Sequence, residues 1–237
     1  LITGDVEYAR LGLVVTDEQH RFGVAQRAAL AGKGEHPHVL VMSATPIPRT
    51  LALILYGDLD VSVIDRLPPG RRPVQTSFVS SRYHPRIYKF LRKLVNEGRQ
   101  AYIVCPQVSQ GEDPGDDRKA VTEYAAMLQQ NIFPDLRIAF VHGKMKSREK
   151  EAVMDAFAQG KTDILVSTTV IEVGVDVPNA AVMVIENAER FGLSQLHQLR
   201  GRVGRGSHQS YCILISDNQN EETCRRLKVM TETADGF

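Results

Sequence analysis

Ile138-Ala-Phe-Val141, Ser147-Arg-Glu-Lys-Glu-Ala-Val-Met-Asp-Ala-Phe157 and Ile164-Leu-Val-Ser167 follow one another along the chain and decide its fold. The first and last runs are short, apolar and rich in Val and Ile, as strands are. In the middle segment the apolar side chains share one helical face. We therefore expect a strand–helix–strand unit, in which Ser147 is the N-cap of the helix and Gly160 is its C-cap.

The same alternation of strand-like and helix-like segments continues along the whole chain. Most of the expected strands are apolar throughout instead of alternating, which is typical of a parallel sheet covered by helices on both faces. The sequence thus predicts the α/β class. The expected strands span 13–16, 39–42, 61–64, 76–79, 101–105, 138–141, 164–167, 181–185 and 211–215.

One segment interrupts both periodicities and predicts a domain boundary. Leu67-Pro-Pro-Gly-Arg-Arg-Pro73 holds three prolines and a glycine in seven residues, and we interpret it as a linker. Residues 1–66 contain too few strands for a complete doubly wound sheet, so we expect a partial lobe there. Residues 74–216 would form a complete lobe, followed by a further segment at 217–237.

Composition excludes several classes of protein. Of the 237 residues, 43% are hydrophobic and 24% charged, which is ordinary for a globular protein and excludes disorder over the whole chain. The net charge of +1 excludes a uniformly basic protein. Three widely spaced cysteines without a CxxC pair argue against a disulfide framework or a zinc site and favour a reducing cytosol. No apolar run is long enough to cross a bilayer, so we expect no membrane partner.

Two polar motifs each follow an apolar strand in the first part of the chain. Asp17-Glu-Gln-His20 offers one carboxylate that can hold Mg²⁺ beside nucleotide phosphates and a second, Glu18, that can orient a water. Ser43-Ala-Thr45 offers hydroxyl groups to a neighbouring loop. A solvated strand end and an ordinary turn entering a helix explain these two motifs equally well, so neither decides the function alone.

The strongest motif is Gln198-Leu-Arg-Gly-Arg-Val-Gly-Arg-Gly206. It contains three arginines in six residues, and the spacing of Arg202 and Arg205 predicts that they share one helical face. Guanidinium groups suit the charge of a transferring phosphoryl group, and the glycines permit close backbone approach. The motif therefore predicts a phosphate-binding site.

Two further motifs follow strands in the second part of the chain. Residues 168–178 place hydroxyl groups at a strand end, where they can grip a phosphate backbone, and Asp176 can reach a sugar hydroxyl or an arginine. His142-Gly-Lys-Met-Lys146 precedes an expected helix start, which is a suitable phosphate site. A constrained turn and a capped loop remain the alternatives. Residues 155–162 end in Gly-Lys-Thr but run from helix to strand, and no GxxxxGK[ST] phosphate loop occurs in the chain.

In their order along the chain, the motifs resemble those of superfamily 2 helicases. Residues 17–20 resemble motif II, 43–45 motif III, 168–178 motif V and 198–205 motif VI. Longer stretches resemble the RecG family of bacterial ATP-dependent branch-migration DNA helicases, and the similarity covers nearly the whole chain. Those stretches are 17–27, 43–52, 67–71, 97–102 and 168–206.

The resemblance implies RecA-like lobes, one partial and one complete, that hydrolyse ATP with Mg²⁺ and move along double-stranded DNA. It implies a bacterial, cytoplasmic and monomeric parent that remodels stalled replication forks and migrates Holliday junctions in recombination and repair. Single-strand-binding protein becomes a candidate partner, and residues 217–237 would begin a translocation motif. Because family members carry their phosphate loop upstream, we expect this chain to be the back half of the motor and inactive alone.

The resemblance also implies roles for individual residues. Asp17 would hold Mg²⁺ through ATP, and Glu18 would activate water. Catalytic or nucleotide-binding roles fall to Asp17, Glu18, Gly174, Asp176, Gln198, Arg202 and Arg205. DNA contact and its coupling to ATP fall to Ser43, Thr45, His142, Gly143, Thr168 and Thr169.

Two alternatives stay open at this stage. The motor of a transcription-repair coupling factor shares Thr45-Pro-Ile-Pro-Arg-Thr50 and the 198–205 motif, and upstream sequence would separate the two families. A non-catalytic DNA-binding module that has lost its phosphate loop is the other. Such a module has no need of Glu18, Arg202 and Arg205.

Overall fold

The computed structural model describes residues 6–17, 29, 32–34, 36–42, 60, 62, 64, 70–106, 116–168 and 176–233. The chain divides into two compact units, which separate between Asp65 and Arg66. The linker, lobe and translocation-motif boundaries expected from the sequence stay predictions.

The first unit contains a two-stranded parallel sheet. Its strands are β1 (Leu13–Thr16) and β2 (His38–Val41), paired from Leu13 opposite His38 to Thr16 opposite Val41. The parallel pairing places the carboxyl ends of both strands at the same edge. Of the expected strand at 61–64, Ser62 and Ile64 are described and neither belongs to a strand; the other two residues lie outside the described part.

A six-stranded sheet forms the centre of the second unit, and all of its neighbouring strands are parallel. The order across the sheet is β3-β8-β7-β4-β6-β5. Each strand lies within one residue of its predicted bounds. The strands are β3 (Gln75–Val79), β4 (Gln100–Val104), β5 (Ile138–Val141), β6 (Ile164–Ser167), β7 (Ala180–Ile185) and β8 (Tyr211–Ile215).

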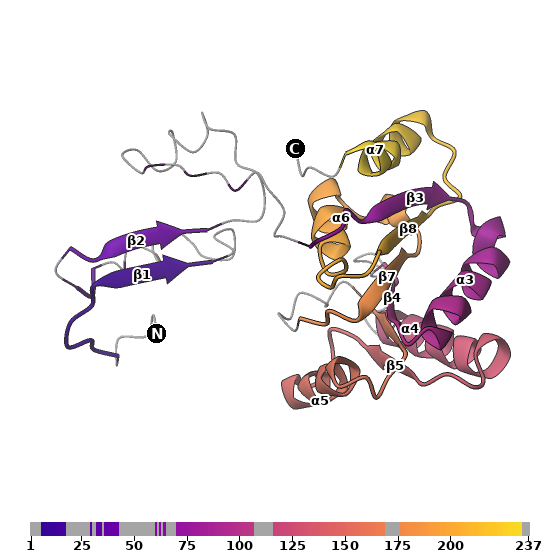
Figure 1. Ribbon diagram of the computed structural model, residues 1–237, viewed down its shortest axis with the longest axis horizontal. Helices are drawn as coiled ribbons and strands as arrows, with labels where there is room; N and C mark the ends of the chain where they lie inside the picture. The colour runs from indigo at the N-terminus through magenta and orange to yellow at the C-terminus, as the bar shows by residue number, and fades with distance from the viewer. Residues whose placement is uncertain are drawn as a thin grey trace. The chain divides into compact units, whose positions relative to one another are not determined.

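Helices cover both faces of this sheet, giving three layers (Figure 1). One face carries α3 (His84–Asn96), preceded by the turn η2 (Ser81–Tyr83), and α4 (Asp116–Met127), which continues into the π-helical turn η3 (Leu128–Ile132). The other face carries α5 (Ser147–Ala158), α6 (Leu193–Arg200) and α7 (Glu221–Glu232). A short turn, η4 (Ala188–Arg190), leads from β7 towards α6.

Alternate residues of each central strand supply the two cores, which explains the unbroken apolar runs in the sequence. In β4, Ala101 and Ile103 belong to the core beneath α3 and α4, while Tyr102 and Val104 belong to the core beneath α5, α6 and α7. All four side chains are buried. A strand with two covered faces has no solvated side on which polar residues could alternate.

The start of α5 differs from the prediction by one residue. Lys146 has extended backbone and is the N-cap, and Ser147 is already the first helical residue. The Glu149 carboxylate accepts a hydrogen bond from the Lys146 amide at 3.2 Å. The bond between the Glu149 side chain and the Lys146 amide therefore decides where the helix begins, and the hydroxyl of Ser147 does not.

The end of α5 also differs from the prediction by one residue, because Gln159 is the C-cap and Gly160 follows it. Gly160 has a φ of +70°, the left-handed conformation that favours glycine after a helix. Its amide donates to Phe157 O, and the Lys161 amide donates to Ala156 O. This pair of bonds stops the helix just before β6 begins.

The three cysteines form no disulfide, and burial raises the pKa of Cys105 and of Cys212 to about 12. Within the described ranges, no helix is both long and apolar enough to cross a bilayer.

Candidate functional site

Several predicted site residues lie outside the described part of the chain: Glu18, Ser43, Thr45, Thr169 and Gly174. Asp17 is described. It is exposed and directly follows β1, at the carboxyl end of that strand.

The arginine motif lies in an irregular segment, which we call the glycine-rich loop (residues 201–210). The prediction that Arg202 and Arg205 share a helical face is wrong, because α6 ends at Arg200 and Gly201 is its C-cap. Gly204 has a φ of +78°, and a Cβ added there would lie 2.7 Å from Val74 Cγ2. Two features thus require glycine at position 204, a left-handed backbone and a close neighbour.

Arg205 forms an ion pair with Asp176, with Nη1 and Oδ1 3.3 Å apart. Its Nε also donates to Gly201 O at 3.1 Å. About a third of the Arg205 side chain (32%) is exposed, so its guanidinium group is both oriented and accessible to an anion. The motif predicted that Asp176 could reach an arginine, and in the structure that arginine is Arg205.

Asp176 lies elsewhere than its motif predicted. It comes four residues before β7 and therefore lies near the amino-terminal end of that strand, whereas Thr168, in the same motif, directly follows β6. The 168–178 segment leads from β6 to β7, two strands of the same sheet that are separated by β4. Thr168 and Asp176, the polar residues of the segment that the structure describes, consequently lie at opposite edges of the sheet.

Arg202, three residues before Arg205 in the glycine-rich loop, is half-buried. Burial raises the pKa of Tyr102 to about 12, and the nearby charges of Arg202 and Arg205 oppose that rise. Both guanidinium groups therefore act electrostatically on the hydroxyl of one core tyrosine. Gln198 is half-buried in the last turns of α6, just before the glycine-rich loop.

The third arginine of the motif has a structural role. Arg200 is buried, and its Nη1 donates to Met230 O at 2.9 Å and to Thr233 O at 2.7 Å. These carbonyls lie at the carboxyl end of α7, where a cation is favourable. Burial lowers the pKa of Arg200. The sequence motif did not distinguish this helix-capping arginine from Arg202 and Arg205.

Three of the predicted DNA-contacting residues are described, and they lie at the carboxyl ends of β5 and β6. His142 and Thr168 are buried, and the Thr168 amide donates to Val141 O at 3.3 Å. Gly143 is exposed, and its carbonyl accepts from Lys150 Nζ at 2.7 Å. These residues lie together at one edge of the sheet, while Arg205 lies at the other.

A polar cluster at the carboxyl edge was not predicted. The Glu186 carboxylate, directly after β7, accepts from His84 Nε2 at 3.0 Å and from the Tyr124 hydroxyl at 2.7 Å. Tyr88 lies 3.2 Å from Tyr124, oxygen to oxygen. The hydrogen bond to Glu186 raises the pKa of His84, and burial raises the pKa of Tyr124. The signal available in the sequence was a carboxylate directly after an apolar strand, the same signal that identified Asp17.

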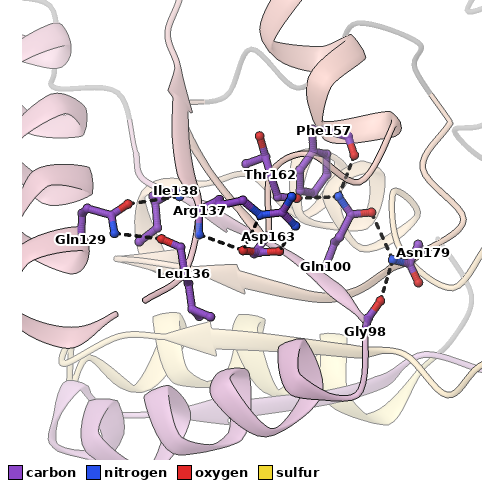
Figure 2. Close-up of polar contacts among 10 residues, drawn as sticks. All are labelled: Gly98, Gln100, Gln129, Leu136, Arg137, Ile138, Phe157, Thr162, Asp163 and Asn179. Atoms are coloured by element: carbon purple, nitrogen blue, oxygen red, sulfur yellow. Dashed lines mark hydrogen bonds and ion pairs between the residues drawn. The ribbon is translucent and has the colours of Figure 1, made fainter. Parts of the chain in front are cut away.

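A second polar network that sequence reasoning missed lies at the amino-terminal edge (Figure 2). Gln100 and Asn179 bond to each other and to backbone carbonyls of three different segments. Asn179 is three residues from Asp176, so this network adjoins the arginine site. No cluster of His, Cys, Asp and Glu suited to a metal ion occurs in the described ranges.

Comparison with known proteins defines the class. The model of the helicase conserved C-terminal domain matches residues 86–207, and the chain belongs to that family. Over its whole length it is 59% identical to the ATP-dependent DNA helicase RecG of Synechocystis sp. and 53% identical to that of Thermotoga maritima, covering 28% and 30% of those proteins. A solved structure of RecG bound to a three-way DNA junction matches with a TM-score of 0.80 and 50% identity, over 100% of this chain and 30% of that one.

These matches confirm the predicted resemblance to RecG and the RecA-like α/β fold class. The chain spans about three tenths of the length of the RecG proteins named above. What those whole proteins do therefore reaches this chain only by inference.

Proposed function

We propose that this chain supplies the second half of the motor of an ATP-dependent DNA translocase. Its parent would remodel stalled replication forks and migrate Holliday junctions. The observation that carries the proposal is the similarity to RecG over all 237 residues, including a RecG solved on a three-way DNA junction. The same similarity favours this function over a transcription-repair motor and over a module without catalysis.

The glycine-rich loop suits a nucleotide phosphate. Two guanidinium groups, those of Arg202 and Arg205, act on the same core tyrosine, and that of Arg205 is partly exposed. Such groups stabilise the charge that spreads over a phosphoryl group during transfer. ATP with Mg²⁺ would supply the bond to be hydrolysed. In this proposal Asp17 holds the metal, Glu18 orients the water, and Gln198 and Gly174 line the nucleotide.

The Asp176–Arg205 pair suits a coupling role. A phosphate oxygen that competes for Arg205 weakens its bond to Asp176, since one guanidinium edge cannot serve both equally. The segment that carries Asp176 begins at Thr168, at the DNA-facing edge of the sheet in this proposal. Nucleotide binding would thereby act on Thr168 and Thr169, at the start of this segment. Ser43, Thr45, His142 and Gly143 complete the set of residues proposed to hold DNA.

The chain alone should hydrolyse little ATP, because its residues include no phosphate-loop motif to cradle the β- and γ-phosphates. The free cysteines agree with a reducing bacterial cytoplasm. A monomeric parent and a contact with single-strand-binding protein stay predictions.

A segment exchange tests the proposal. The matching residues of Synechocystis RecG are replaced by this chain, and ATP hydrolysis is measured with and without forked DNA. The hybrid should hydrolyse ATP in a DNA-stimulated manner, and Glu18→Gln should lower the turnover by about a thousandfold. The isolated chain serves as the control that lacks a phosphate loop. A folded hybrid without DNA-stimulated turnover would contradict the proposal.

A further inference from the structure

The orientation of the Gln100 side chain is determined by its partners. Gln100 is 4% exposed, and its Nε2 donates to Phe157 O at 2.6 Å and to Thr162 O at 2.7 Å. Only the nitrogen of an amide can face two carbonyl oxygens. The Gln100 oxygen must therefore point the other way, towards Asn179, as Figure 2 shows.

This orientation in turn determines that of Asn179. Its Nδ2 donates to Gln100 Oε1 at 3.2 Å and to Gly98 O at 2.8 Å, and its Oδ1 accepts from Arg99 Nη1 at 3.1 Å. The backbone adds a bond from the Gln100 amide to Asn179 O at 3.1 Å. Asn179 is consequently held from one side by four hydrogen bonds to residues 98–100.

Asn179 ends the turn of residues 176–179, and the other end of that turn meets the glycine-rich loop. A Cβ added to Gly206 would lie 2.5 Å from Pro178 O, so the two backbones are in close contact. Val177 is buried in the core beneath α5, α6 and α7. Asp176 then pairs with Arg205. A shift of Asn179 therefore moves both the carbonyl against which Gly206 packs and the carboxylate that orients Arg205.

We propose that Gln100 and Asn179 are positioning residues, which set the geometry of the Arg205 guanidinium group through the turn of residues 176–179. Neither side chain touches a phosphate in this role. The catalytic consequence rests on the function proposed above, whereas the effect on the geometry of Arg205 does not.

The matched control is Gln129. Its side chain makes the same kind of bonds at the same edge of the sheet. Nε2 donates to Leu136 O at 2.8 Å, and Oε1 accepts from the Ile138 amide at 3.2 Å (Figure 2). Nε2 also donates to Phe133 O at 3.0 Å. It serves β5, which lies at the far end of the strand order from β8, the strand that follows the glycine-rich loop. Gln129→Ala thus removes a comparable network away from Arg205.

The first test is the Nε–Hε NMR signal of Arg205 in the isotope-labelled 237-residue chain, assigned by its loss in Arg205→Lys. Asn179→Ala should move or broaden this signal, and Gln129→Ala should leave it in place. Asn179→Asp serves as a second variant. It keeps Oδ1, which accepts from Arg99, and replaces the donor Nδ2 by an oxygen that can only accept. An unmoved signal in folded Asn179 variants would overturn the proposal.

The second test uses the hybrid helicase with forked DNA. Asn179→Ala should lower kcat and kcat/KM together by about tenfold, because a misplaced Arg205 loses transition-state contacts. Gln129→Ala should lower the Tm without changing kcat. Equal kcat in the two variants contradicts the inference. An unmodified hybrid without turnover contradicts the proposed function instead, and the NMR signal still decides the positioning role.

Discussion

Replacing Gln100 by leucine should destabilise the second unit, although leucine fills nearly the same volume. The Thr162 carbonyl, on a residue that is 6% exposed, loses the one donor that the described residues give it. The Phe157 carbonyl keeps a second partner, the Gly160 amide at 3.0 Å. Asn179 loses one acceptor of its Nδ2 and keeps the other, Gly98 O.

The magnitude follows from these three losses. A buried carbonyl without a partner costs about 1–3 kcal/mol, and each of the other two bonds contributes about 0.5–1 kcal/mol. The free energy of unfolding should therefore fall by about 2–5 kcal/mol. For a unit of this size that corresponds to a fall in Tm of about 10 °C.

Thermal and urea unfolding of the 237-residue chain, followed by circular dichroism, measure the effect. Gln100→Ala is the companion variant, which adds a cavity to the same lost bonds and should be the less stable of the two. If Gln100→Leu unfolds at the wild-type temperature, packing and not hydrogen bonding holds this edge of the sheet, and the reasoning on Gln100 is wrong.

Three other predictions concern backbone, pH and salt. Gly204→Ala should lower the Tm more than Gly160→Ala in the same unfolding assay. Both glycines have positive φ, but an added Cβ lies 2.7 Å from Val74 only at position 204. An equal fall in Tm for the two variants would refute the close contact. The bond to Glu186 raises the pKa of His84 in the folded chain. The stabilisation from this bond is therefore full below about pH 6.5 and is lost as pH rises through the raised pKa of His84. The Tm, measured over a series of pH values, should decline in that range for the unmodified chain and not for His84→Gln. DNA binding by the chain, measured by fluorescence anisotropy, should weaken steeply with salt, and salt-independent binding would exclude contact through phosphates.

The fold of the second unit could be predicted because local signals and long-range packing agree there. Strands such as Ile164–Ser167 are buried on both faces, so their composition alone marks them. Gly160 marked the end of α5 for a local reason, its left-handed backbone. The predicted start of α5 was wrong by one residue because Lys146 and Ser147 could both be the N-cap, and the side chain of Glu149 decided between them.

The sequence predicted which residues form the arginine motif, but it predicted their secondary structure and contacts less well. Spacing suggested a helical face for Arg202 and Arg205, yet the glycines end the helix first. Arg200 belongs to the same motif but caps α7, a contact between residues thirty positions apart that spacing cannot reveal. In the sequence, Gln100 and Asn179 belong to no pattern that indicates a catalytic or binding role. Their importance comes from the carbonyls they meet in the folded chain.

The most direct test of the account is the processing of a labelled three-way DNA junction by the hybrid RecG that carries this chain. With ATP, the hybrid should convert the junction at a rate close to that of the parent RecG, and Arg205→Ala should abolish conversion while leaving junction binding intact. A hybrid that folds and binds the junction but does not convert it would contradict the assignment of this chain to a DNA-translocating motor.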